Sequence, residues 1–122
     1  MGGSRRRLAA WLAQGVAGRL LDAASTYLCI SLGLQEVNPR AAQLLPRPEL
    51  FVPLQILAGI LLGLLSHASE LAGLKGAEHA PPEWKGRLRA IGRFGALAIA
   101  AVNWLPVPWN LLQAALALAA RL

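Results

Sequence analysis

Two long stretches of this chain carry no charged side chain, and few folds can accommodate them. The first runs from Leu50 to Ser69 without any Asp, Glu, Lys or Arg, and Glu49 and Glu70 bracket it. Because a helix rises about 1.5 Å per residue, a run of this length spans a bilayer core of roughly 30 Å. The sequence therefore predicts a membrane-spanning helix at residues 50–69.

The second charge-free stretch covers residues 94–120 and is longer than one upright span needs. Pro106 and Pro108 interrupt it, and proline kinks or breaks a helix. Trp104 lies beside them, and tryptophan is enriched where a membrane meets water. We predict a proline-kinked span at about residues 90–118. The alternative is a span that ends near Trp104 and continues as a short amphipathic tail on the outer surface.

A third apolar segment, residues 8–34, is interrupted by Gln14, Arg19 and Asp22. Its strong helix formers and lack of proline favour one continuous helix, with a membrane part at about residues 16–35. The basic residues before it then form an interfacial lead-in. A cleaved signal peptide is the competing interpretation, but Arg19 and Asp22 would fall in or just after its apolar region.

Composition agrees with a small helical membrane protein. Of the 122 residues, 56% are hydrophobic and 15% are charged, whereas soluble domains have about 25% charged residues. This hydrophobicity excludes a disordered chain, and the single cysteine excludes a disulfide scaffold. We therefore expect an all-α fold, an integral membrane three-helix bundle that forms one domain over residues 1–122.

The net charge of +6 would suggest a nucleic-acid partner in a soluble protein. Most of the basic residues instead lie beside the apolar runs. Three precede the first run and five lie between residues 70 and 93, against two in residues 35–49 and one at the C-terminus. Because lysine and arginine favour the cytoplasmic side, the N-terminus is predicted to be cytoplasmic and the C-terminus outside.

Small and polar residues recur at helical spacing inside the predicted spans. One face of the first span carries Gly15, Gly18, Asp22, Thr26, Cys29 and Gly33. Helices associate in lipid through small residues and hydrogen bonds, so this face should contact protein. Together with Gln55 and Asn103 of the other spans, Asp22 and Thr26 are predicted to form a polar cluster inside the membrane.

The second span carries Gln55, Gly59, Gly63 and His67 at steps of four residues. Its G-x-x-x-G pattern allows two helix backbones to approach closely. Gly59 and Gly63 are therefore predicted to be helix-packing residues.

Asp22 is the side chain that most needs an explanation, because an acid is costly inside a membrane. Arg19 can pair with it one turn earlier on the same helix, and this pair could fix helix packing. Alternatives are a proton-relay, ion-binding or catalytic role, or a contact with another subunit. His67 is expected at a similar depth near the cytoplasmic end.

The pattern from Asp22 to Pro39 reads D-x-x-S-T, then G-x-x-E-x-N-P. It resembles the signature of an uncharacterised family of small prokaryotic membrane proteins, a domain of unknown function with three spans. The resemblance implies a helical bundle in the prokaryotic inner membrane and implies no activity. The family often has lysine at the place of Gln55, so this chain lacks one possible ion-pair partner for Asp22 or Glu36.

The end of this motif, Glu36, Asn38 and Pro39, lies just after the first span. A residue before proline is disfavoured in a helix, so the helix should stop there. Asn38 can cap free carbonyl groups or start a turn. Glu36 can then be a carboxylate brace at a helix end, or part of an outward-facing ligand or cation site.

No metal-ligand spacing, nucleophile motif or phosphate loop appears in the sequence, so we expect neither metal nor cofactor. The leading hypothesis is a non-enzymatic accessory or scaffolding subunit. It would contact the lipid bilayer and associate with itself or with a larger membrane complex, without nucleic acid. One alternative is proton, ion or small-solute permeation by an oligomer that uses Asp22 and Glu36. Another is an intramembrane, lipid-directed enzyme with Asp22 and His67 as acid and base.

Overall fold

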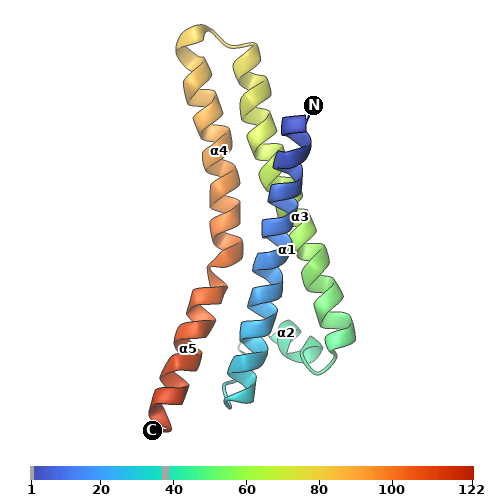
Figure 1. Ribbon diagram of the computed structural model, residues 1–122, viewed down its shortest axis with the longest axis vertical. Coiled ribbons are helices and arrows are strands. Elements are labelled where there is room, and N and C mark those ends of the chain that lie inside the picture. Colours follow the sequence, from blue (N-terminus) through green and yellow to red (C-terminus); the bar gives the residue numbers. More distant parts are fainter. Residues whose placement is uncertain (1, 37–38) are drawn as a thin grey trace.

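The computed structural model describes residues 2–36 and 39–122, and these ranges contain five helices and no strand. The helices are α1 (Gly2–Ser31), α2 (Pro39–Leu44), α3 (Pro48–Glu78), α4 (Pro82–Trp104) and α5 (Pro106–Ala120). Three rods, α1, α3 and the joined α4 and α5, form an elongated bundle (Figure 1). The N-terminus and the α3–α4 connection lie at one end, and α2 and the C-terminus lie at the other. The predicted all-α fold is confirmed.

Two of these rods are long and apolar enough to cross a membrane. They are α3, with 31 residues, and the continuous segment Pro82–Ala120, with 39 residues. Both extend past the charge-free runs, so that only residues 79–81 connect α3 to α4. The remaining rod, α1, carries Arg19 and Asp22 in its C-terminal half.

The third rod bends where α4 meets α5. Leu105 keeps a right-handed helical backbone, with φ −55° and ψ −39°. Pro106 and Pro108 have no N–H to donate to the carbonyl four residues earlier, and this interrupts the hydrogen-bond ladder. As a result α5 continues α4 at an angle (Figure 1), which is the bend expected from the two prolines.

The first helix stops at a glycine. Gly33 has φ +88°, a left-handed conformation that glycine adopts without steric cost. Its N–H bonds to Ile30 O at 2.9 Å, and the N–H of Leu34 bonds to Cys29 O at 3.0 Å. These two bonds form a Schellman motif, so α1 ends just before Gly33, ahead of the N-P step.

Glycines set the crossing between α1 and α3. A Cβ atom added to Gly15 would lie 2.3 Å from Gly59 O, and one added to Gly63 would lie 2.6 Å from Trp11 O. Any side chain at these positions would therefore push the backbones apart. The two glycines predicted to pack, Gly59 and Gly63, both lie at this crossing.

A second close crossing joins α3 to α4. A Cβ atom on Gly92 would lie 2.7 Å from the Cα atom of Gly73. Ser69 donates to Gly92 O at 2.9 Å, and Ser66 donates to Ala96 O at 3.0 Å. Small residues and hydroxyl-to-carbonyl hydrogen bonds therefore hold these two helices together, as is typical of helices packed in lipid.

Apart from Leu45 and Phe51 beside α2, the buried side chains are small or polar, and many large apolar side chains are exposed. The largest fully buried side chains are Asn103 and Ser66. By contrast, Phe94 is 74% exposed and Val102 is 71% exposed. This distribution is the reverse of a soluble core, in which large apolar side chains lie inside.

Candidate functional site

A charged cluster lies between α1 and α3, near the end of the bundle that carries α2. Asp22 Oδ2 accepts a hydrogen bond from Arg19 Nη2 on the same helix. Arg19 Nε donates to Gln55 Oε1 of α3 at 2.8 Å. The ion pair is mostly buried, with side-chain exposures of 18% for Arg19 and 15% for Asp22. The guanidinium group thus links the carboxylate to the second rod.

Asn110 of α5 completes this cluster from the third rod. Its amide nitrogen lies 2.9 Å from Asp22 Oδ1, 3.0 Å from Ser25 Oγ and 3.2 Å from Thr26 Oγ1. The two carboxylate oxygens of Asp22 therefore accept from different helices. Of the predicted members, the structure brings Asp22, Thr26 and Gln55 together.

Asn103, the fourth predicted member, lies elsewhere. It is buried, and its amide nitrogen donates to Gly15 O at 3.1 Å. The reason is helix register. Asn103 and Asn110 share a helix face because seven residues make about two turns, or roughly 10 Å. α1 runs parallel to the third rod (Figure 1), and the same offset places Asn103 beside Gly15 and Asn110 beside Asp22.

The predicted proximity of His67 and Asp22 is wrong. Arg19 bonds to both Asp22 and Gln55, so these two residues lie at about the same height along the bundle. His67 is twelve residues further along α3, a rise of about 18 Å. This separation places the imidazole beyond hydrogen-bond reach of the carboxylate, so the two groups do not form an acid–base pair.

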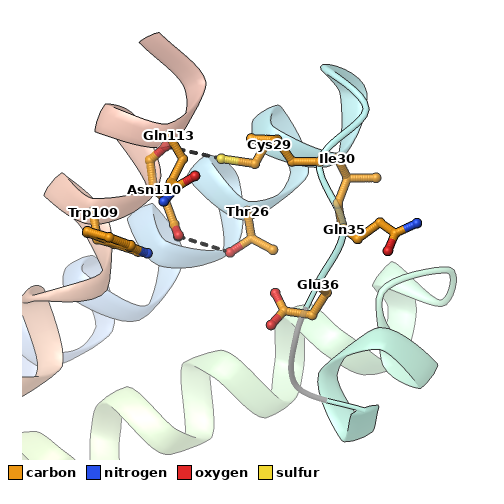
Figure 2. Close-up of a pocket in the computed structure, with 9 residues that line it drawn as sticks. Thr26, Cys29, Ile30, Gln35, Glu36, Trp109, Asn110 and Gln113 are labelled. Carbon is orange, nitrogen blue, oxygen red and sulfur yellow. Dashed lines mark hydrogen bonds between the residues drawn. The ribbon is translucent and has the colours of Figure 1, made fainter. Parts of the chain in front are cut away.

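A cavity of about 260 Å³ opens beside the cluster, and we call it the polar cavity. Its lining includes Arg19, Asp22, Thr26, Glu36, Gln55 and Asn110. A second cavity of about 340 Å³ shares Thr26, Glu36 and Asn110 with it and adds Trp109 and Gln113. Figure 2 shows this second cavity, with Glu36 on one side and Asn110 and Trp109 on the other.

The helix-end motif contributes to these cavities through Glu36, which lines both. Asn38 lies outside the described residues, and Pro39 is the first residue of α2. α2 itself packs at the mouth of the polar cavity, where Ala41 is part of the lining. It is held by Leu45, which lies buried with Ala23 and Phe51, and whose carbonyl accepts from Tyr27 Oη at 2.8 Å.

An apolar groove adjoins the polar cavity at the helix bend. This kink groove has a volume of about 570 Å³ and is lined by Leu105, Pro106, Pro108, Trp109 and Leu112. Pro106 also lines the polar cavity, and Trp109 also lines the second cavity. Pro106 and Trp109 therefore separate the apolar groove from the two neighbouring cavities.

Towards the N-terminus the space between α1 and α3 closes. The backbones of Gly15 and Gly59 are in contact, and the Asn103 side chain fills the position beside Gly18. The polar cavity therefore does not continue towards the N-terminus between these two helices, and its lining offers hydrogen-bond donors and acceptors.

Within residues 2–36 and 39–122 no group of three or more His, Cys, Asp or Glu side chains is placed to hold a metal ion. Comparison of the chain with protein-family models, curated proteins and solved structures finds no match.

Proposed function

We propose that this protein is an integral membrane protein of three spans that binds an amphiphilic, lipid-like molecule. The membrane placement is supported by the two rods long enough to cross a bilayer and by the exposed apolar exterior. α1 would be the third span, because its charged residues face the bundle interior, where Arg19 pairs with Asp22.

The observation that carries the proposed activity is that the polar cavity and the kink groove share Pro106 as a wall. An amphiphile has a polar head and an apolar tail, and the two neighbouring spaces suit these two parts. Arg19, Asn110 and Glu36 offer donors and acceptors to the head. Leu105, Pro108 and Leu112 offer an apolar wall to the tail.

The scaffolding hypothesis assigned no ligand to the residues of the polar cavity, whereas the present proposal does. The glycine faces on which a scaffold would depend are occupied within the chain, since Gly59 and Gly63 pack against α1. The closed space between α1 and α3 likewise supports binding rather than permeation through a single chain. Scaffolding is the second candidate, because both carboxylate oxygens of Asp22 already accept hydrogen bonds within the chain.

Membrane placement is tested first, by alkaline carbonate extraction of cell membranes that contain the full chain. An integral protein stays in the pellet and is released only by detergent. Release by carbonate would contradict the membrane placement and, with it, the whole proposal.

Ligand binding is tested by filling the polar cavity. Ala41 lines it from α2, so Ala41→Trp should occupy the space without removing any hydrogen bond of the cluster. Ala98 is exposed on α4, so Ala98→Trp is a matched control. After purification in mild detergent, mass spectrometry should find one amphiphile enriched with the wild type and with Ala98→Trp, and lost from Ala41→Trp. Retention by Ala41→Trp would contradict the proposal, and a stable partner protein with no enriched amphiphile would support scaffolding.

A further inference from the structure

A second charged cavity lies at the opposite end of the bundle, where the N-terminus is. It has a volume of about 250 Å³ and is lined by Arg7 of α1, Glu70 and Leu74 of α3, and Arg89 and Arg93 of α4. We call it the basic cavity. It shares no residue with the polar cavity at the α2 end.

The packing of the three rods builds this cavity. Trp11 Nε1 donates to Glu70 Oε1 at 3.4 Å, which ties α1 to α3. Arg7 lies one helical turn before Trp11 and therefore on the same face of α1. The contact of Gly73 with Gly92 brings α4 against α3, next to Leu74 and Arg93. The three arginines thus converge from two helices on either side of α3.

The charge of the basic cavity is unbalanced. Three guanidinium groups line it against one carboxylate, that of Glu70. Within residues 2–36 and 39–122, none of these three arginines has a carboxylate oxygen within 4.0 Å. Planar guanidinium groups match the oxygens of a phosphate group and bind it through paired hydrogen bonds.

The position of the basic cavity relative to the charge-free runs indicates the source of such a phosphate group. Glu70 ends the charge-free run of α3, and Arg93 directly precedes the run of α4 and α5. On the proposed membrane placement, α3 and α4 therefore leave the apolar layer at this level, where lipid headgroups lie, and Arg7 belongs to the interfacial lead-in of α1. The excess of lysine and arginine at this end also predicts the cytoplasmic side.

We infer that the basic cavity binds the phosphate group of an anionic glycerophospholipid in the cytoplasmic leaflet. Basic spaces between spans on this side are suited to anionic headgroups. Arg7, Arg89 and Arg93 would contact the phosphate group. The inference rests on the proposed membrane placement, but it does not depend on the amphiphile at the α2 end.

The test is native mass spectrometry of the full chain in detergent, titrated with phosphatidylglycerol or with phosphatidylcholine. The wild type should bind phosphatidylglycerol in preference. The double variant Arg89→Gln, Arg93→Gln should bind it at least about tenfold more weakly, because two charge-assisted hydrogen-bonding groups are lost. The matched control Lys75→Gln, Lys85→Gln removes the same charge at the same end from residues outside the lining, and should stay within about twofold of the wild type.

Equal binding of the two lipids would overturn the inference, as would an equal loss in the lysine control, which would indicate a general charge effect. A further titration adds inorganic phosphate in excess as a competitor. If it displaces phosphatidylglycerol completely, the site takes a soluble phosphate and the lipid assignment is wrong. Circular dichroism and size-exclusion elution establish that each variant folds. A protein that stays in the carbonate pellet but shows no lipid preference would contradict this inference alone.

Discussion

The Asn110 amide nitrogen lies 2.9 Å from Asp22 Oδ1, although 88 residues separate the two in sequence. The same amide is within hydrogen-bond distance of Ser25 and Thr26. This contact fastens the bent half of the third rod to the polar face of α1. It also closes one side of the polar cavity, so that the helix bend and the charged cluster form one structural unit.

Replacement of Asn110 with leucine should destabilise the protein. Asp22 Oδ1 would lose its donor from α5, and a mostly buried acceptor without a partner costs about 1–3 kcal/mol, less if the membrane or a water satisfies it. Thermal unfolding in detergent, followed by circular dichroism, measures the change. Gln113→Leu, one turn further along α5, is the control and should cost clearly less; equal losses would contradict the role assigned to Asn110.

The Arg19–Asp22 pair should show strong coupling in a double-mutant cycle. Arg19→Met alone leaves a mostly buried carboxylate without its counter-ion, which costs about 3–5 kcal/mol for a fully buried pair. Since this pair is partly exposed, we expect a smaller loss. Adding Asp22→Asn should recover part of the stability, because the double variant contains no unpaired charge. Additive losses in the unfolding free energies would show that the two groups act independently.

The α1–α3 crossing should not tolerate a side chain at Gly59. Its Cβ atom would lie 2.6 Å from Gly15 O, a backbone atom that cannot turn aside. Gly59→Ala should therefore lower the unfolding temperature. Gly86→Ala is the matched control, because nothing lies within 4 Å of its Cβ position. Alanine favours a helix over glycine by about 1 kcal/mol, so the control should be neutral or stabilising.

The predicted topology can be read from cysteine labelling in intact cells. Cys29 is buried, and Cys29→Ala provides a cysteine-free background. A cysteine at His79, in the α3–α4 connection, should react only after the membrane is permeabilised. A cysteine at Gln43 of α2 should react with a membrane-impermeant maleimide from outside. The opposite pattern would reverse the orientation inferred from the positive charges.

Periodicity and proline chemistry made much of the architecture predictable. The charge-free runs located α3 and the third rod, and Pro106 and Pro108 located the bend. The G-x-x-x-G pattern identified the glycines at the α1–α3 crossing. Each of these features depends on neighbours within a few turns of one helix, which the order of residues records directly.

The membership of the polar cluster could not be obtained in this way. Asn103 and Asn110 lie on the same helix face, so periodicity treats them as equivalent. On α3, Gln55 and His67 belong to one series of four-residue steps, and the sequence does not say which of them lies level with Asp22. The choice within each pair depends on how far one helix slides along another, and that register is set by the close approach of Gly15 to Gly59.

The amino-acid sequence thus determined the helices, the bend and the polar faces, because these follow from local chemistry and spacing. Helix register, a property of the packed bundle, determined that Asp22 meets Gln55 through Arg19 and meets Asn110 directly. It also built the polar cavity, whose lining comes from helices that are distant in sequence, whereas the kink groove is lined by neighbouring residues of the bend itself.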